Sequence, residues 1–528
     1  MKRGWMLLTV LALWAGCALG AVTQLLPGQK AYVKCAPPGR DLGTIILNPG
    51  DTLICGTPAA GGPTPTRTAS PTRTATPTRT ATPTASATPV PTIVPTGSPA
   101  TQSRTPTASP LPTPVPTPTV IAGTAYFVDN SIACSDTSAG TSPAAPWCSV
   151  AKAMAKQASL APGDGILFKC GDVWNEQFNL ANIHGSVGRP VIIGHYGSNC
   201  VLPNRTYTAT LPTLNGGSTR KHGFYADNSG VSYVTIDGFN IHDTTLGGIV
   251  INASGSNMPG ITIENNLVHQ VGPGACAGCG TPSDPGGGSQ YGENPGIGFS
   301  DFGTKPVSNG VHILNNTVWD TGGHNTLRIH YDSSPDVLVS GNLVGPGCLH
   351  NCMDTKGING TVSNNIATCP ESSARGEQCG SGTAGVYSEN TYVTAGVSPR
   401  WISNVMHDIA ICSQAEGDSG HAMKPKFYNN TCINPSNYGL YYKTAKNADV
   451  QKNLLAGQIA STSGSFATWD YNDNFGASGN PTGAHDVSVN PLYVNPAAGD
   501  FMPQAASLLA GWSVSTVTAY DYLGAVGP

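Results

Sequence analysis

A short phrase recurs through the second half of this 528-residue sequence. VTIDGFNIHD, ITIENNLVHQ, VHILNNTVWD and KFYNNTCIN each alternate apolar residues with others, turn at Asn or Gly, and continue with another apolar residue. A repeat of this kind is a unit that cannot bury its apolar face alone, so several units must stack. The final asparagines of the successive phrases are Asn266, Asn316, Asn342, Asn365, Asn404, Asn430 and Asn453.

The intervals between these asparagines are 50, 26, 23, 39, 26 and 23 residues. Intervals of 23 to 26 residues predict one coil of a parallel β-helix, 39 a coil with an insertion, and 50 either two coils or one long insertion. We expect the asparagines to form a side-chain hydrogen-bond ladder from coil to coil. The insertions at 273–295 and 370–382 either wall a groove or are plain surface loops.

The segments before and after the repeats suit the ends of such a stack. AYFVDN predicts a strand from Ala125, and a short amphipathic helix follows over about 148–159, before the next strand. A helix placed there would cover the open edge of the first coil. VSVNPLYVNPAAGDFMPQAASLLAGW is expected to close the other end.

The phrases YFVDN, LAPGDGILFKCG and NPLYVNPAAGDF, together with the repeated coils, resemble bacterial secreted proteins of the pectate-lyase-like superfamily. The resemblance covers about residues 124–528 and implies an all-β fold, a right-handed parallel β-helix with an N-terminal capping helix. The superfamily includes polysaccharide lyases. The same fold also hosts epimerases, glycoside hydrolases and non-enzymatic adhesins, so it does not select an activity.

The sequence before the β-helix divides into three parts. Residues 1–20 have the basic start, apolar core and small-residue site of a secretory signal, which predicts export. Lipid anchoring through Cys17 is an alternative. Residues 21–56 predict a small disulfide-linked β module, and 57–122 a Pro/Thr-rich linker that cannot bury apolar surface. The β-helix domain then takes 123–528. No later segment predicts a membrane span, and we expect a monomer.

The cysteine count agrees with an oxidising compartment. Of 15 cysteines, Cys17 lies in the signal segment, and the rest are even in number. The CxxC at Cys276 and the Cys348, Cys352 pair are alternative zinc ligands. Pairing of sequence neighbours predicts the disulfides Cys35–Cys55, Cys134–Cys148, Cys170–Cys200, Cys276–Cys279, Cys348–Cys352, Cys369–Cys379 and Cys412–Cys432.

Charged side chains are scarce, at 11% of residues against about 25% in typical domains. A net charge of -4 gives no support to a nucleic-acid partner. Four functional-type side chains nevertheless fall on two segments, NTLRIHYD and NCMDTKG. Because strand side chains alternate between faces, Arg328 and His330 share a face, as do Asp354 and Lys356. If the segments are neighbouring strands, they form a charged, solvent-facing ladder.

The same alignment extends the ladder to other strands. The register of the segment around Cys412 to Glu416 stays open. The predicted outward positions are Asn252, then Ser300, then Arg328 and His330, then Asp354 and Lys356, then Tyr387 and Glu389, and later Tyr441 and Lys443.

These residue types suit β-elimination from a uronic-acid polymer such as pectate, alginate or a glycosaminoglycan. The reaction needs a neutralised carboxylate, a base for the C5 proton and an acid for the leaving oxygen. We expect Lys356 to be the base, if Arg328 lowers its pKa, or Arg328 to hold the carboxylate. His330 or Tyr387 would supply the acid.

The remaining positions predict binding roles. Asp354 and Glu389 offer oxygens for calcium. The expected substrate-binding residues are Lys443, Tyr441 and Asn252. The chain lacks the clustered aspartates of the pectate-lyase calcium site and any nucleotide-binding Gly-rich loop.

Four other interpretations stay open. Glycoside hydrolysis needs two carboxylates, for which Asp354 pairs with Glu389 or with Asp332. A C5-epimerase would remove the same proton without cleaving the chain. A glycan-binding adhesin would need no chemistry. Asp354 and Lys356 could also merely neutralise each other. The histidines His242, His269 and His407 are expected to be structural.

Overall fold

The computed structural model describes residues 121–503 and the backbone of two short strands before them. The gaps in 121–503 are 132, 228–229, 254–257, 273–294, 301–309, 331–335, 370–382, 391–392, 394–395, 419, 463, 476, 479–480, 482, 492 and 496–499. The chain divides into two units, Met1–Arg104 and Thr105–Pro528. In the first unit, β1 (Lys30–Val33) and β2 (Thr52–Cys55) pair in parallel.

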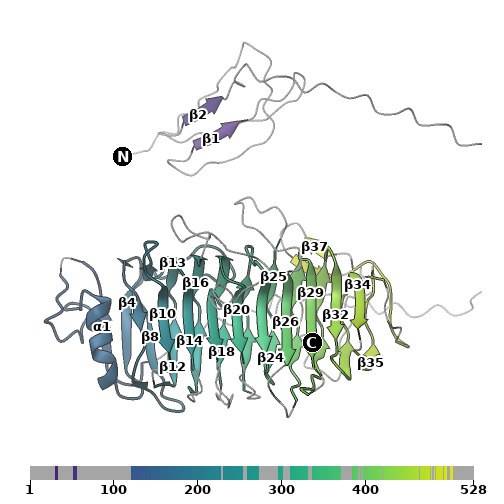
Figure 1. Ribbon diagram of the computed structural model, residues 1–528. Coiled ribbons are helices and arrows are strands. Elements are labelled where there is room, and N and C mark those ends of the chain that lie inside the picture. Colours follow the sequence, from purple (N-terminus) through teal and green to yellow (C-terminus); the bar gives the residue numbers. More distant parts are fainter. Residues whose placement is uncertain are drawn as a thin grey trace, which may run out of the picture. The chain divides into compact units, whose positions relative to one another are not determined.

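Three long sheets, in which every pairing is parallel, build the second unit (Figure 1). Each turn of the chain contributes one strand to a sheet, so neighbours in a sheet are one coil apart in sequence. This arrangement is a parallel β-helix, as the repeat predicted. The predicted signal, linker and domain boundaries stay predictions.

Sheet 1 carries the predicted charged ladder. Its described strands are β6 (Phe178–Asn179), β10 (His222–Asp227), β14 (Gly247–Asn252), β17 (Ile297–Ser300), β20 (Asn325–His330), β23 (Asn351–Lys356), β26 (Ala384–Asn390), β29 (Ile411–Gly417), β32 (Tyr438–Lys443), β34 (Gly457–Thr462) and β36 (Ala477–Ser478).

Sheet 2 contains the strands that lead into the asparagine turns. They are β3 (Ala125–Val128), β4 (Gly165–Lys169), β8 (Val191–Tyr196), β12 (Val234–Asp237), β15 (Ile261–Glu264), β18 (His312–Leu314), β21 (Leu338–Ser340), β24 (Thr361–Ser363), β27 (Arg400–Ile402), β30 (Lys426–Tyr428), β33 (Ala448–Gln451) and β35 (Phe466–Asp470).

Sheet 3 follows those turns. Its strands are β5 (Val173–Trp174), β9 (Thr213–Asn215), β13 (Asn240–Thr244), β16 (Leu267–Val271), β19 (Thr317–Thr321), β22 (Leu343–Val344), β25 (Ile366–Thr368), β28 (Val405–His407) and β31 (Thr431–Ile433). Two small pairs complete the described strands, β7 (Ile183–His184) with β11 (Val231–Ser232), and antiparallel β37 (Tyr493–Asn495) with β38 (Asp500–Pro503).

A continuous apolar core fills the coils. In sheet 1 one inward position is occupied on successive strands by apolar side chains that are fully buried. Because apolar side chains of successive coils stack on one another, the apolar surface of each coil is kept away from water. This burial stabilises the fold by about 25 cal/mol per Å² of buried area. These stacked residues are Ile249, Ile297, Leu327, Met353 and Val386.

The predicted asparagine ladder is confirmed. Asn316 Nδ2 donates to Asn342 Oδ1 at 3.0 Å, and Asn342 Nδ2 donates to Asn365 Oδ1 at 2.9 Å. The same bond joins every marker from Asn266 to Asn453 and continues to Asn472. Since all of these amides are buried, each bond satisfies groups that would otherwise lose their water partners.

The residue before each ladder asparagine adopts a left-handed backbone. The φ angles are 58° at Asn265, 54° at Asn315 and 57° at Asn364. Asparagine tolerates this region better than most residues. The two adjacent asparagines of the repeated phrase therefore have different roles. The first adopts the left-handed conformation that bends the chain, and the second forms the ladder hydrogen bonds.

The two irregular intervals are single coils with insertions. Across the 50-residue interval, β15 pairs directly with β18 and β14 with β17, so no extra coil intervenes. Across the 39-residue interval, β24 pairs directly with β27. The bulk of the two insertions, 273–294 and 370–382, lies outside the described residues.

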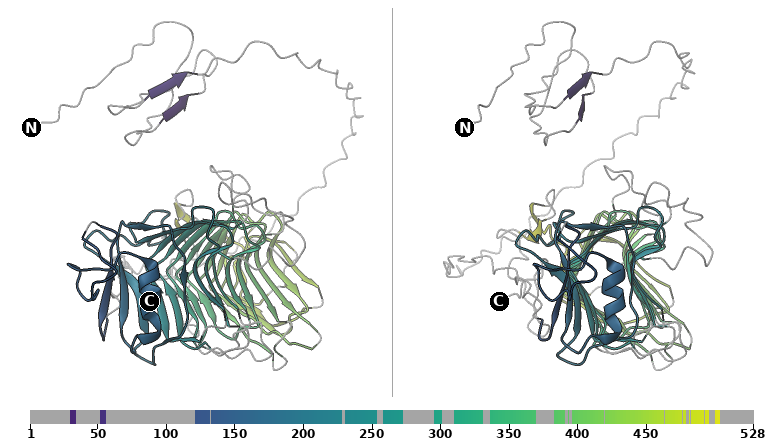
Figure 2. Two further views of the ribbon diagram at one scale, coloured as in Figure 1. Left: turned by 60° about the vertical axis from the view of Figure 1, so that its left-hand side comes forward. Right: turned by 90° about the vertical axis from the view of Figure 1, so that its left-hand side faces the viewer.

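The predicted capping helix is confirmed as α1 (Val150–Lys156), followed by a 3₁₀ turn, η1 (Gln157–Ser159). Ser149 caps it, because its hydroxyl accepts a hydrogen bond from the Lys152 amide at 3.0 Å. Val150 and Ala153 are buried in the core. Figure 2, in its right-hand view along the coil axis, shows α1 lying across the end of the coils.

Four predicted disulfides are confirmed, namely Cys134–Cys148, Cys170–Cys200, Cys348–Cys352 and Cys412–Cys432. The predicted pairs Cys35–Cys55, Cys276–Cys279 and Cys369–Cys379 involve residues whose side chains lie outside the described set.

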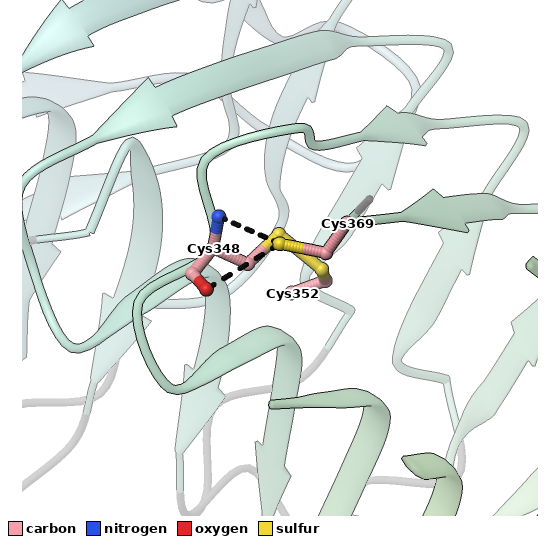
Figure 3. Close-up of side chains that lie close together, drawn as sticks. All are labelled: Cys348, Cys352 and Cys369. Carbon is pink, nitrogen blue, oxygen red and sulfur yellow. Dashed lines mark hydrogen bonds between the residues drawn. A yellow bond between two sulfur atoms is a disulfide. The ribbon is translucent and has the colours of Figure 1, made fainter. Parts of the chain in front are cut away.

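Cys369 lies against the Cys348–Cys352 disulfide, and the three sulfur atoms are within 4.8 Å of one another (Figure 3). The Cys348 amide donates to Cys369 Sγ at 3.3 Å. All three cysteines are disulfide-bonded, and zinc binds thiolates. The alternative zinc interpretation of Cys348 and Cys352 is therefore wrong.

Candidate functional site

The outward side chains of sheet 1 form two parallel rows, and their predicted register is confirmed. Row A pairs Arg328 with Asp354, Asp354 with Tyr387, Tyr387 with Gln414 and Gln414 with Tyr441. Row B, two residues further along each strand, consists of Asn252, Ser300, His330, Lys356, Glu389, Glu416 and Lys443.

The first part of the ladder is not solvent-facing, which corrects the prediction. Arg328 is 1% exposed, His330 4% and Asp354 0%. Arg328 lies beside Gly298 of the preceding strand, where a side chain would stand 3.5 Å from its Nε. Arg328 and His330 are therefore unsuited to holding a large substrate.

His330 and Asp354 form a buried pair, with 3.1 Å between His330 Nε2 and Asp354 Oδ2. Burial lowers the pKa of His330, and the Asp354 carboxylate opposes that shift. Burial alone would raise the pKa of Asp354, but His330 and Lys356 outweigh it and hold the value at about 2. The Asp354 carboxylate thus stays ionised, with His330 and Lys356 as the groups that lower its pKa most.

Two histidines beside this pair escaped the sequence interpretation. His324 and His350, just before β20 and β23, stack with ring centroids 3.8 Å apart. Burial, with the neighbouring His350, lowers the pKa of His324 to about 4, and burial also lowers the pKa of His350. They lie outside the two segments from which the ladder was predicted. Their matching place before two aligned strands was the available signal.

The accessible part of the site centres on Glu389. Its Oε2 lies 3.1 Å from Lys356 Nζ and accepts a hydrogen bond from the Tyr387 hydroxyl, also at 3.1 Å. The Lys356 and Glu389 side chains are 23% and 19% exposed. Lys356 Nζ is 5.7 Å from the centre of the Tyr387 ring. One carboxylate therefore holds both a cation and a phenol at the edge of solvent.

Tyr387 is held in its protonated form. Burial raises the pKa of its phenol, and the carboxylates of Glu389, Glu416 and Asp354 raise it further, because a phenolate would face like charges. For Lys356 the carboxylate at 3.1 Å favours the ammonium, opposite to the lowered pKa that a general base would need.

Glu416 is a second carboxylate that the sequence interpretation missed. It follows Glu389 by 27 residues and lies directly beside it on the next strand. Gln414 Nε2 donates to Glu416 Oε1 at 2.7 Å, and Lys443 Nζ donates to Oε2 at 3.4 Å. The equal 27-residue steps from Glu389 to Glu416 and from Glu416 to Lys443 were the signal.

The three predicted substrate-binding residues lie at the two ends of the rows. Tyr441 ends the row A pairs, one strand beyond Gln414, and Lys443 ends row B with a side chain 53% exposed. Asn252 lies three strands from Lys356, with Ser300 and His330 between them. The structure brings Tyr441 and Lys443 near the accessible carboxylates and leaves Asn252 apart.

Calcium binding by Asp354 and Glu389 stays a prediction that this geometry does not favour. Asp354 faces His330 and is fully buried, whereas Glu389 faces Lys356 and Tyr387. A calcium ion needs six to eight oxygens, and here each carboxylate has a nitrogen partner of its own. Among the described residues, the one group of three close metal-ligand atoms is the cysteine cluster.

The other predicted histidines lie on sheet 3, away from the two rows. His242 Nδ1 is 2.8 Å from Asp243, and His407 Nδ1 is 2.9 Å from Asp408. The ring of His269 stacks on Trp319 with centroids 4.7 Å apart. These contacts agree with the structural role expected from sequence.

No family model matches the sequence. Over 80 residues, or 15% of this chain, it is 35% identical to the lacto-N-biosidase of Bifidobacterium longum subsp. longum, and the match spans 5% of that protein's length.

Two solved structures are similar at low sequence identity. Pectate lyase Pel9A is 14% identical, with 77% of this chain and 96% of that chain covered and a TM-score of 0.47. The GH136 lacto-N-biosidase of Eubacterium ramulus is 13% identical, with 69% and 67% covered and a TM-score of 0.43. The parallel sheets confirm the predicted resemblance at the level of the fold, and they do not select an activity.

Within the described residues, no helix is long and apolar enough to cross a membrane.

Proposed function

We propose that this protein is a secreted enzyme that binds an acidic polysaccharide across the outer face of sheet 1 and cleaves it by β-elimination. The observation that carries the proposal is the Lys356, Glu389 and Tyr387 group, in which one carboxylate oxygen contacts both an ammonium and a phenol. It offers a cation, a base and an acid in contact with one another, with the cation and the base partly exposed. The four described disulfides support an oxidising compartment.

Each group has a role in this reaction. The Lys356 ammonium neutralises the substrate carboxylate next to C5, which makes the C5 proton more acidic. Glu389 takes that proton as the C4–O bond breaks and the C4–C5 double bond forms. Tyr387 gives its phenolic proton to the leaving oxygen. Glu389 then returns a proton to Tyr387 through their hydrogen bond, which restores both groups.

This assignment moves the base from Lys356, as expected from sequence, to Glu389. The reason is the ion pair, because a lysine with a carboxylate at 3.1 Å is held protonated. Tyr387 keeps the acid role. A phenol with a raised pKa remains protonated until the leaving oxygen needs its proton.

Hydrolysis is a second candidate, and the pairing of Glu389 with Glu416 favours it. The two carboxylates lie on adjacent strands, which are about 4.8 Å apart. Retaining glycoside hydrolases separate their two carboxyl groups by about 5–5.5 Å. The local similarity to a lacto-N-biosidase sequence also supports hydrolysis.

One assay separates the two chemistries. The full chain is incubated with pectate, alginate, glycosaminoglycans and a neutral glycan, and both unsaturated-uronate absorbance and new reducing ends are followed. β-Elimination predicts absorbance that is lost in Tyr387→Phe and kept in Glu416→Gln. Hydrolysis predicts reducing ends without absorbance, and loss in Glu416→Gln. Glycan binding with no product would leave the adhesin, and C5 inversion without cleavage the epimerase.

A further inference from the structure

Two tyrosines of β32 form an aromatic surface beyond the reacting group. The rings of Tyr438 and Tyr441 stack with centroids 5.1 Å apart and an angle of 20° between their planes. Both are partly exposed. They pack on a small apolar cluster that is separate from the main core and includes Ala384, Ala410 and Ile411.

A local bend puts both tyrosines on the outer face, although they are three residues apart. Gly439 and Leu440 lie between them, and Leu440 is fully buried. A side chain at Gly439 would meet the Ala456 carbonyl oxygen of the next coil at 2.1 Å. The register of β32 against β34 shifts between Tyr438 and Leu440, so Tyr438 does not follow Leu440 into the core. The platform depends on a glycine at this position.

Tyr441 has a polar neighbour on one side and a small neighbour on the other. Gln414 is its neighbour on β29, and Ala460 is its neighbour on β34. Lys443, two residues further along, is 53% exposed and lies 3.4 Å from Glu416 Oε2 at its Nζ. The site therefore combines an aromatic ring, a small neighbour that leaves room beside it, and a cation.

We propose that Tyr438 and Tyr441 form a sugar subsite that stacks on the apolar C–H face of a pyranose ring, while Lys443 binds an acidic group of the glycan. The inference rests on the proposed function and deepens it. The face of an aromatic ring is negative and attracts the positive edge of a partner, here the sugar C–H groups. A hydroxyl-rich edge of the same sugar remains free for Gln414.

The coil spacing sets the distance of this subsite from the reaction. Strands of sheet 1 are about 4.8 Å apart, close to the length of one sugar residue in a chain. From Glu389 on β26 to Tyr441 on β32 there are two such steps. A glycan that runs along the coil axis reaches the platform about two sugar residues from the bond that is cleaved.

Binding is measured by calorimetry on the full chain carrying Glu389→Gln, with dimer, tetramer and hexamer oligosaccharides of galacturonate, mannuronate and chondroitin. Adding Tyr441→Ala is expected to weaken hexamer binding about tenfold and to change dimer binding little, while Tyr441→Phe retains the affinity. Tyr471→Ala is the matched control, because Tyr471 stacks on His485 beside sheet 2, with centroids 4.3 Å apart.

The outcomes separate this inference from the proposed chemistry. If hexamer binding falls with Tyr441→Ala but the native chain cleaves nothing, the subsite stands and the β-elimination proposal fails. If cleavage is intact and Tyr441→Ala leaves hexamer affinity unchanged, the subsite is overturned. An equal loss in Tyr471→Ala, or no binding of any oligomer, also overturns it.

Discussion

The two halves of the charged ladder have similar residue types and different surroundings. Arg328, His330 and Asp354 are buried, and His330 pairs with Asp354, whereas Lys356 and Glu389 reach solvent. A buried charge set is costly to assemble and is kept only when it is paired. We therefore assign the first half to holding β20 and β23 in place and the second half to chemistry. Charged residues that follow one another along the sheet therefore differ in role according to their burial.

The largest expected effect tests the accessible half. Glu389→Gln keeps the shape of the side chain but removes the base, so we expect activity to fall by about 10²-fold or more. The melting temperature should change little. The matched control is Glu176→Gln, near α1, whose carboxylate accepts from the Val150 amide. Equal loss of activity in both variants would contradict the assignment.

The next effect tests the buried half. Asp354→Asn removes the carboxylate that pairs with the buried His330, which is expected to cost about 3–5 kcal/mol of unfolding free energy. Chemical denaturation measures it. Asp336→Asn, in an aspartate whose side chain is 75% exposed, should stay within about 0.5 kcal/mol. If Asp354→Asn is as stable as the native chain, the buried half does not act as a structural unit.

A smaller effect is a loss of stability in weak acid. His222 and His324 have pKa values of about 4 in the fold, and the ordinary value is 6.5. The unfolded chain binds more protons between these values, so stability is complete above pH 6.5 and falls as pH drops toward 4. At pH 5 each histidine has lowered the free energy of unfolding by up to about 2 kcal/mol relative to pH 7. The loss is smaller for His324, because its side chain is partly exposed.

Thermal unfolding between pH 7 and pH 5 measures this dependence. His222→Gln is expected to flatten it, because the substituted residue does not titrate. If His222→Gln has the same pH dependence as the native chain, burial of the His222 imidazole does not contribute to it.

The smallest expected effect concerns calcium. Because Asp354 and Glu389 each have a nitrogen partner, we expect a chelator to change activity by less than about twofold. A loss restored by added calcium would reverse this expectation and return the two carboxylates to a metal-binding role.

The fold was predictable because its signals are local and repeated. Paired asparagines such as Asn315 and Asn316 mark a left-handed bend and a ladder position, and strand alternation set the register of Asp354 against Tyr387. Burial was not predictable, because it depends on what covers a face. Glu416 was missed because Cys412 and Ser413 are both buried, which breaks the alternation just before it.

The asparagine ladder has a consequence for how this molecule can change. The ladder requires only that one asparagine of each coil occupy the same position. The number of residues between successive asparagines does not matter. Circuits of 23 and of 50 residues join the same column of amides. New segments can therefore be gained or lost between strands while the column of amides stays continuous, so such a scaffold can change its surface without rebuilding its interior.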